Sequence, residues 1–285
     1  MSDAAELRAG LVQLTVGDDP LENLTRTIPL IRAAAAEGAR LVLTPEATNL
    51  LSPDRARQQK VLHPEATDPT LSALRAEARA AGIWLLIGSL ALKSGDADDR
   101  FVNRSVLIDP AGGIVARYDK LHMFDVQISE TETYRESAAY RPGNRAVLAG
   151  MDGLHLGMTI CYDLRFPHLY RRLAQAGARI LTVPSAFNPT TGEAHWEVLL
   201  RARAIETGCF VLAPAQCGTH PAPHSPDRPP RRSHGHSLAV DPWGRVLADG
   251  GVTPGVTIVR LDLGAVDRAR SRIPSLTHDR AFEGP

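Results

Sequence analysis

Cysteine is scarce in this chain of 285 residues: it occurs three times, as Cys161, Cys209 and Cys217. Three cysteines cannot all pair with one another, and a chain of this length can bury a core without disulfides, so we expect reduced thiols. Net charge is missing as well, because 32 basic residues balance 32 acidic ones. The sequence therefore carries no electrostatic footprint for nucleic acid or for an anionic membrane surface.

Long apolar runs are also missing. None approaches the roughly 20 residues that a membrane-spanning helix needs, so we expect no membrane partner. The stretch from Met1 to Glu6 is polar and acidic, unlike the basic and then apolar start of a secretory leader. No low-complexity linker divides the chain, and 44% of it is hydrophobic. These features predict a cytoplasmic enzyme with a single domain over residues 1–285.

What is present is a repeated alternation of strands and helices, which predicts an α/β fold. Strands are predicted over residues 7–16, 40–44, 83–92, 100–109, 114–118, 180–183 and 209–213, and helices over 21–36, 69–81, 167–176 and 194–207. Pro29 is expected to kink or shorten the first helix, because proline lacks the amide donor and crowds the preceding turn. Residues 110–113 predict a hairpin turn, and residues 237–261 predict the closing strands.

Cys161 stands where an apolar run, Leu154 to Ile160, turns sharply toward a predicted helix. A thiol at such a turn points outward, and the backbone N–H groups that begin the helix, including that of Tyr162, surround the sulfur. These groups favour the thiolate and can later hold an oxyanion. Taken alone, Cys161 is better explained as a small buried apolar residue than as a nucleophile. Its interpretation as a nucleophile depends on two further segments.

Two other predicted strands also end in chemically useful residues. Residues 40–44 lead to Glu46, and residues 114–118 lead to Lys120. Taken singly, both would be ordinary surface charges, but strand ends at one edge of an α/β sheet are where such folds gather their chemistry. Glu46 could take the proton of the Cys161 thiol and return it to a leaving amine. Lys120 could lower the thiol pKa and stabilise a tetrahedral intermediate.

The order Glu46, Lys120, Cys161 with these flanks resembles the nitrilase superfamily of carbon–nitrogen hydrolases, and the resemblance covers nearly the whole chain. It implies a four-layer α-β-β-α sandwich whose two sheets pack face to face. It also implies a Glu-Lys-Cys catalytic triad that works on a small-molecule amide without a cofactor or a metal.

The resemblance further implies a second glutamate that supports the lysine and the attacking water. Glu136 falls at the expected place, in the run Tyr134-Arg135-Glu136-Ser137. Glu130 and Glu132 lie nearby, and spacing alone does not choose among the three acids.

Assembly is a second implication of the resemblance, because family members pair through the helix after the cysteine and the helix spanning residues 196–206. We therefore expect a homodimer or a higher homo-oligomer. Its expected contact face consists of Leu169, Leu173, Val198, Leu199 and Ile205.

Residues 184–206 resemble the Nit branch of the superfamily, which contains deaminated glutathione amidases and omega-amidases. In that branch an arginine four residues after the cysteine, with a Phe and a Thr of the next segment, holds the oxoacid carboxylate end of the substrate. The matching residues are Arg165, Phe187 and Thr191. Arg165 offers a planar fork to a carboxylate, although it could instead serve a structural ion pair with Asp163.

These features predict an amidase that forms a thioester on Cys161, with Glu46 first as acid and then as base. The expected substrate is deaminated glutathione, giving 2-oxoglutarate and cysteinylglycine. Residues 123–125 are nearer the omega-amidase pattern, so 2-oxoglutaramate is the alternative, and nitrile hydrolysis is disfavoured. A catalytically silent binding module is the alternative from another class, and the intact triad argues against it.

Two further expectations concern residues around the site. His195 and Trp196 are expected to pack beneath it rather than to touch substrate. The segment from Cys217 to His236 also contains His220, His224 and His234. Together these side chains could coordinate zinc, but their irregular spacing argues against a metal site. The prolines and arginines of the segment predict an exposed, stiff loop over residues 218–233, whose role in substrate entry the sequence does not decide.

Overall fold

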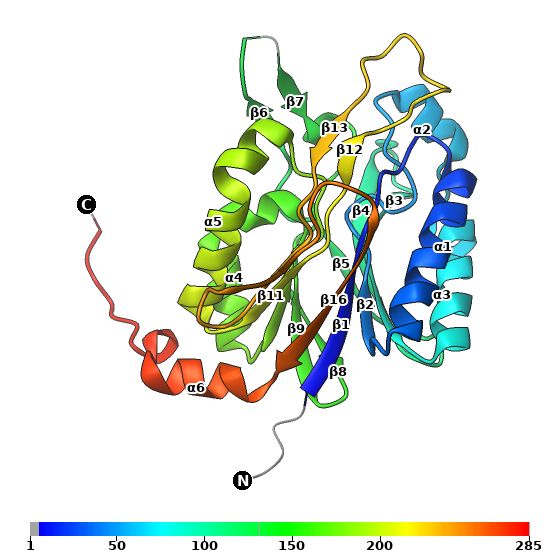
Figure 1. The fold of residues 1–285 in the computed structure, drawn as a ribbon. Coiled ribbons are helices and arrows are strands. Elements are labelled where there is room, and N and C mark those ends of the chain that lie inside the picture. Colours follow the sequence, from blue (N-terminus) through cyan, green and yellow to red (C-terminus); the bar gives the residue numbers. More distant parts are fainter. Residues whose placement is uncertain (1–5, 131, 285) are drawn as a thin grey trace.

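Two six-stranded sheets form the centre of the computed structural model, which describes residues 6–130 and 132–284 (Figure 1). The first sheet contains β1 (Glu6–Gln13), β2 (Leu41–Leu43), β3 (Trp84–Lys93), β4 (Phe101–Ile108), β5 (Ile114–Asp119) and β16 (Gly255–Asp262), in the order β16-β1-β2-β3-β4-β5. The second contains β8 (Val147–Met151), β9 (Leu154–Met158), β10 (Ile180–Thr182), β11 (Phe210–Ala213), β14 (Leu238–Val240) and β15 (Val246–Asp249), in the order β15-β14-β11-β10-β9-β8. In each sheet three adjacent strands run parallel, namely β1-β2-β3 and β9-β10-β11, and the flanking strands pair antiparallel.

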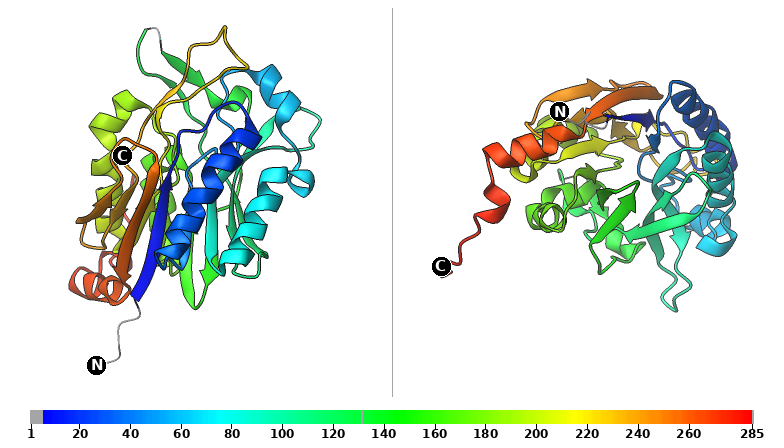
Figure 2. Two further views of the ribbon diagram at one scale, coloured as in Figure 1. Left: turned by 45° about the vertical axis from the view of Figure 1, so that its right-hand side comes forward. Right: turned by 90° about the horizontal axis from the view of Figure 1, so that it is seen from below.

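Helices cover the outer face of each sheet. The first sheet is covered by α1 (Pro20–Ala36) and α3 (Pro69–Ala81), and the second by α4 (Pro167–Gln175) and α5 (Pro189–Thr207). Seen from below, the helices lie outside two sheets that face each other (Figure 2). The predicted four-layer α-β-β-α sandwich is therefore confirmed.

The alternation of side chains along the strands explains this layering. In β2, Leu41 and Leu43 point into the core between the sheets, where they share one apolar cluster with Leu156 and Met158 of β9. Val42 points the other way, into the apolar layer beneath α1 and α3. A strand that is apolar on both faces is thus buried on both faces, as expected for parallel strands covered by helices.

The first helix is found close to its predicted range of 21–36, but a second helix boundary differs from the prediction. Helix α1 runs from Pro20 to Ala36, so Pro29 does not shorten it; Asp19 caps its first turn, and Ile31 and Ala34 are buried in its second half. Helix α5 begins at Pro189 rather than at 194, because the Asn188 side chain accepts a hydrogen bond from the N–H of Thr191 at 3.3 Å.

Several short elements are not predicted from the sequence. They are α2 (Arg55–Val61), α6 (Gly264–Arg272), β6 (Asp125–Gln127), β7 (Thr133–Arg135), β12 (Cys217–Thr219), β13 (Arg232–His234) and the 3₁₀ turns η1 (Glu65–Thr67), η2 (Glu136–Ala138), η3 (Cys161–Arg165) and η4 (Ser275–Thr277). The two hairpins, β6-β7 and β12-β13, project from the end of the sandwich where the parallel strands terminate (Figure 1). Within the part of the chain described, no helix is long and apolar enough to cross a bilayer.

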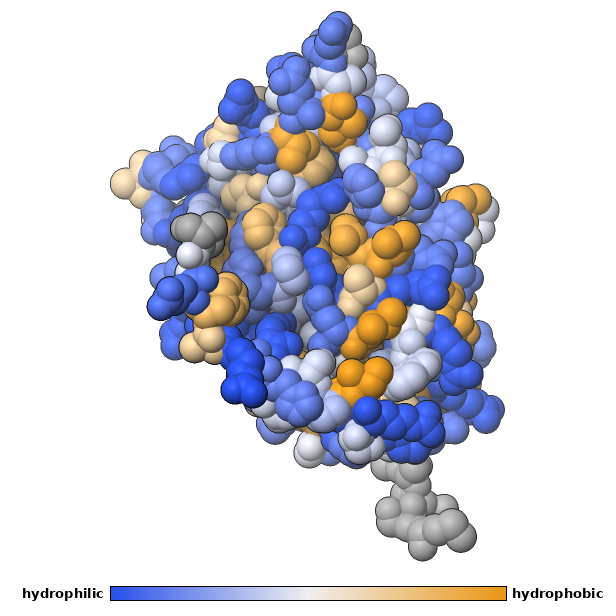
Figure 3. Space-filling model, turned by 90° about the vertical axis from the view of Figure 1, so that its left-hand side faces the viewer, coloured by the Kyte–Doolittle hydropathy of each residue, from blue (hydrophilic) through white to orange (hydrophobic). Residues whose placement is uncertain are grey.

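The expected contact face for a dimer is partly wrong. Leu169 and Leu173 of α4 are buried against the second sheet, because they form the apolar side of that helix. Val198 and Ile205 of α5 do face outward, with 68% and 56% of their surface exposed. Apolar side chains lie among polar ones on this side of the molecule (Figure 3).

Candidate active site

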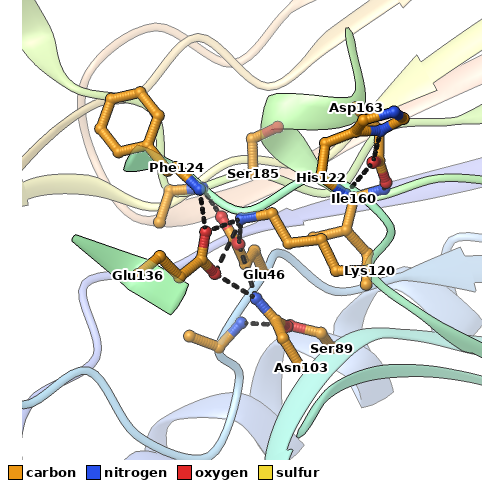
Figure 4. Close-up of polar contacts among 12 residues, drawn as sticks. Glu46, Ser89, Asn103, Lys120, His122, Phe124, Glu136, Ile160, Asp163 and Ser185 are labelled. Carbon is orange, nitrogen blue, oxygen red and sulfur yellow. Dashed lines mark hydrogen bonds and ion pairs between the residues drawn. The ribbon is translucent and has the colours of Figure 1, made fainter. Parts of the chain in front are cut away.

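Three strand ends bring Glu46, Lys120 and Cys161 together. Glu46 follows β2 and Lys120 directly follows β5, both in the first sheet, whereas Cys161 follows β9 in the second sheet. The Lys120 ammonium lies 3.0 Å from Oε1 of Glu46, and all three side chains are buried. The site therefore lies at the seam between the two sheets, and Figure 4 shows the polar contacts of Glu46 and Lys120.

The Glu46 carboxylate is held at both of its oxygens. Oε1 accepts hydrogen bonds from Lys120 and, at 2.9 Å, from Nδ2 of Asn103. Oε2 accepts one from the backbone N–H of Ala186 at 2.8 Å. The backbone carbonyl of Glu46 also accepts a hydrogen bond from Nε2 of Gln216 at 2.9 Å. These contacts fix the side chain in one orientation.

Glu136 contacts Lys120 beside Glu46, and Nδ2 of Asn103 donates to both carboxylates. Its carboxylate oxygens lie 2.8 and 3.0 Å from the Lys120 ammonium, and its Oε2 also accepts a hydrogen bond from the N–H of Phe124 at 2.6 Å. Glu132 instead accepts hydrogen bonds from the hydroxyl of Tyr134 and from Nδ2 of Asn188. Of the acids that spacing could not separate, Glu136 is thus the one in contact with the lysine.

The ionisation of these groups follows from their mutual contacts. Burial raises the pKa of Glu46, but the charges of Lys120 and Arg231 and the hydrogen bonds from Cys161 and Lys120 outweigh it, so the pKa lies below its usual value. Burial lowers the pKa of Lys120, but Glu136 and Glu46 hold it well above the usual value. A carboxylate and an ammonium are therefore the resting forms.

The Cys161 thiol is protonated at rest. Burial raises its pKa far above the usual value, and the Glu46 carboxylate raises it further, while Lys120 acts in the opposite direction. Burial and the Glu46 charge thus outweigh the lowering effect of Lys120 on the thiol pKa, which agrees with the expected role of Glu46 as the base that takes the thiol proton. Cys161 and Glu46 line the same pocket, and each side chain shifts the pKa of the other.

The backbone at Cys161 adopts a conformation that few residues with a Cβ adopt, with φ of 49°. Its N–H donates to the carbonyl of Pro184 at 3.0 Å, and the N–H of Ile160 donates to Asp163 at 2.9 Å. These bonds hold the sharp turn that the sequence predicts. The N–H of Tyr162 belongs to the first turn of η3, where backbone donors have no acceptor within the helix.

Asp163 is a buried carboxylate that the sequence analysis does not single out. It accepts hydrogen bonds from the hydroxyl of Tyr118 at 2.6 Å and from the backbone N–H of His122 at 3.0 Å, and it lies 2.7 Å from Nδ1 of His122. Asp163 therefore ties the segment that carries Lys120 to the turn that carries Cys161. The alternative of an ion pair between Asp163 and Arg165 is not observed among the described residues.

A pocket of about 290 Å³ opens onto these groups. It is lined by the side chains of Glu46, Asn103, Lys120, Phe124, Tyr134, Arg135, Glu136, Tyr140, Cys161, Tyr162, Phe187, Asn188, Thr191 and Arg231, among others. Phe187 and Thr191 thus lie where the sequence analysis expects substrate contacts. Of the remaining lining residues, Arg231 comes from the proline-rich and arginine-rich segment whose role the sequence left open.

Arg165 lies beside this pocket rather than in its lining. Its guanidinium packs 5.4 Å from the centre of the Phe187 ring and 5.9 Å from that of Tyr162, and Nη1 lies 3.3 Å from Nδ1 of His195. Trp196 packs beneath Phe187 with ring centres 5.0 Å apart, as expected. His195 is exposed, so the expectation that it packs beneath the site is wrong.

The segment from Cys217 to His236 forms the β12-β13 hairpin and its long connection. His220 is buried, with its ring nitrogens 2.7 Å from the carbonyl oxygen of Val16 and 2.8 Å from the hydroxyl of Ser233. Across the described ranges, no three His, Cys, Asp or Glu side chains are arranged to hold a metal ion.

Comparison with protein families identifies the chain. The model of the carbon-nitrogen hydrolase family matches residues 8–271. The chain belongs to this family. The resemblance drawn from the Glu, Lys and Cys segments is therefore confirmed, and this carbon-nitrogen hydrolase is an amide-hydrolysing enzyme.

Relatives and solved structures agree with this assignment. A deaminated glutathione amidase of Yersinia enterocolitica is 40% identical over 271 residues, which cover 95% of this hydrolase and 92% of that protein. The NitFhit protein of Caenorhabditis elegans superposes with a TM-score of 0.87 at 34% identity, covering 97% of this chain and 66% of the worm protein. An amidase from Nesterenkonia, in a structure showing Michael addition of acrylamide at its active site cysteine, gives a TM-score of 0.75 at 28% identity, covering 94% and 98%.

Proposed function

We propose that this hydrolase cleaves deaminated glutathione into 2-oxoglutarate and cysteinylglycine, with Cys161 as nucleophile. The observation that carries the proposal is that Glu46, Lys120 and Cys161 line one pocket, with the Lys120 ammonium 3.0 Å from the Glu46 carboxylate. The name of the Yersinia relative and the cysteine chemistry of the Nesterenkonia amidase support the substrate and the nucleophile.

The first half-reaction transfers the acyl group to sulfur. Glu46 takes the thiol proton as Cys161 Sγ attacks the amide carbon, and the carbonyl oxygen becomes an oxyanion next to Lys120 and the N–H of Tyr162. The carbon–nitrogen bond then breaks, Glu46 gives its proton to the departing amine, and a thioester remains on Cys161.

The second half-reaction uses the same groups in reverse. Water replaces the amine, and Glu46 accepts one of its protons while the hydroxide attacks the thioester carbon. The carbon–sulfur bond breaks, the sulfur regains the proton from Glu46, and the carboxylate product leaves. Glu136 keeps the Lys120 ammonium in place through its two short contacts during both steps.

Arg165, Phe187 and Thr191 are the proposed binding site for the oxoacid carboxylate of the substrate. Phe187 and Thr191 line the pocket, and the Arg165 guanidinium lies against the Phe187 ring. Arg165 would therefore need to turn its fork toward the pocket when a carboxylate enters, which its half-buried position allows.

Steady-state rates test this assignment. We expect kcat/KM for deaminated glutathione to exceed that for 2-oxoglutaramate, the omega-amidase substrate, and mass spectrometry of quenched reactions to detect an acyl group on the Cys161 peptide. A larger value for 2-oxoglutaramate would reassign the enzyme as an omega-amidase. Absence of turnover and of any acyl-enzyme with both amides would favour a binding module.

We also propose that the hydrolase forms a homodimer and works in the cytoplasm. The exposed Val198 and Ile205 of α5 support the dimer, because large apolar side chains that face outward on one helix favour burial against a second copy. The three free cysteines support a reducing compartment, since the mechanism needs Cys161 as a thiol.

A further inference from the structure

Arg231 brings a positive charge into the pocket from the loop of residues 218–233. Its Nη2 donates a hydrogen bond to the carbonyl of Ala186 at 3.0 Å, and its side chain is half-buried. The N–H of the same Ala186 donates to Oε2 of Glu46 at 2.8 Å. Arg231 and the proposed acid–base residue are therefore joined through a single residue.

Arg231 has donors to spare, unlike Lys120, the pocket cation that contacts Glu46. Lys120 is occupied by Glu46 and Glu136, as described above. No carboxylate lies within ion-pair distance of Arg231 in the described ranges, and its one hydrogen bond, to the Ala186 carbonyl, uses one of five N–H groups. A half-buried guanidinium with no carboxylate in direct contact is suited to an anionic group of a ligand.

The loop that carries Arg231 is anchored at both ends. The side chain of His220 bridges the carbonyl of Val16 and the hydroxyl of Ser233, two residues after Arg231. The hydroxyl of Ser225 and the N–H of His224 both donate to Oδ2 of the buried Asp18. Such anchoring fixes the guanidinium before the ligand arrives, which lowers the entropic cost of binding.

We propose that Arg231 binds the carboxylate of the leaving half of the substrate, the glycine carboxylate of cysteinylglycine. The inference rests on the proposed function, in which Glu46 protonates the departing nitrogen and therefore lies beside it. The leaving half begins at that nitrogen, and Arg231 is the cation joined to Glu46 through Ala186. A substrate whose leaving group is ammonia has no carboxylate on its leaving half for this guanidinium to bind.

The inhibition constants of the two products test the binding of each half of the substrate separately. For Arg231→Gln we expect the inhibition constant of cysteinylglycine to rise on the order of 10- to 100-fold, the loss of one charge-assisted contact, while that of 2-oxoglutarate stays within about threefold. The value of kcat/KM for deaminated glutathione should fall by a similar factor. Arg231→Lys should recover part of the loss, because it keeps the charge without the fork.

Arg232→Gln is the matched control, because Arg232 is the exposed neighbour of Arg231 and lines no part of the pocket. It should change neither inhibition constant. If Arg231→Gln raised both inhibition constants equally, or left that of cysteinylglycine unchanged, the assignment to the leaving half would be overturned. A native enzyme that does not cleave deaminated glutathione would overturn the proposed function itself, and this inference with it, before any variant is compared.

Discussion

At the scale of single residues, we propose that Cys161 and Glu46 act as one proton-transfer pair. A buried thiol with a raised pKa is a poor nucleophile by itself, but the adjacent carboxylate, with a lowered pKa, is ready to take its proton. In the proposed mechanism the positive charge of Lys120 stabilises the carboxylate before the transfer and the oxyanion after the attack. Burial and the Glu46 charge raise the pKa of the sulfur, so it needs a base to lose its proton.

The pH dependence of activity should follow from this pair. Glu46 is a base only when ionised, and its lowered pKa means that kcat/KM should fall only as the pH drops below about 4.3, the usual value for glutamate. No rise in rate is expected around pH 8.5, where a free thiol would ionise, because the pKa of Cys161 lies far above that value. A profile of kcat/KM against pH, measured with the native enzyme, checks both the fall at low pH and the absence of a rise near pH 8.5. A rate that increased with an apparent pKa near 8.5 would contradict transfer to Glu46.

Replacing the proposed nucleophile should lower catalytic activity without unfolding the protein. Cys161→Ala should lower kcat by about 10³-fold or more, while the free energy of unfolding changes by less than about 1 kcal/mol, because alanine meets the same positive φ with a smaller side chain. Iodoacetamide should label Cys161, which lines the pocket, before the fully buried Cys209 and Cys217. Equal labelling of the three thiols, or activity in the variant, would argue against the thioester mechanism.

At the scale of secondary-structure elements, the end of β2 must approach the end of β10, where Pro184 holds the Cys161 turn, for the site to form. Gly88 of β3 lies between them: a Cβ there would lie 2.0 Å from the carbonyl oxygen of Thr44 and 2.5 Å from Pro184. Thr44 precedes the Glu46 turn, and Pro184 accepts the hydrogen bond from Cys161. Because Gly88 has no side chain, the segments that contain Thr44 and Pro184 can approach each other this closely.

Gly88→Ala should therefore damage both stability and activity. We expect a loss of about 1 to 3 kcal/mol in the free energy of unfolding, typical of overpacking, together with a lower kcat because the two strand ends are pushed apart. Gly150→Ala in β8 is the control, since a Cβ there meets nothing within 4 Å, and it should stay within about 0.5 kcal/mol. Urea unfolding and steady-state kinetics measure both quantities. A Gly88 variant as stable and active as the control would contradict this packing argument.

The alternating pattern predicts most of the long elements, because strands such as 83–92 and helices such as 69–81 bury enough apolar surface to be visible in the sequence. The short hairpins escape prediction because they bury little. Arg231 and Asp163 escape for another reason: their roles depend on partners far away in the chain, Ala186 for the first and Tyr118 for the second. Spacing likewise could not separate Glu136 from Glu132, which only the fold of the β6-β7 hairpin distinguishes.

At the scale of the whole molecule, the outward face of α5 makes the assembly testable. Val198→Glu with Ile205→Glu should shift the protein from dimer to monomer, because both side chains are more than half exposed in the single chain and would place charges in the interface. Val115→Glu is the control, an exposed valine on the edge strand β5 of the other sheet. Sedimentation velocity at micromolar concentration measures the outcome. A native monomer, or the same shift with Val115→Glu, would count against the proposed interface.

The pairing of β1 with β16 has a consequence for the synthesis of the chain. These strands join residues 6–13 to residues 255–262, so β1 is synthesised well before the strand that covers its outer edge. Until β16 pairs with it, β1 presents an unpaired apolar edge, the kind of surface that chaperones protect in a nascent chain. Completion of the first sheet, and with it the rigid support of Glu46, thus depends on a segment far along the chain.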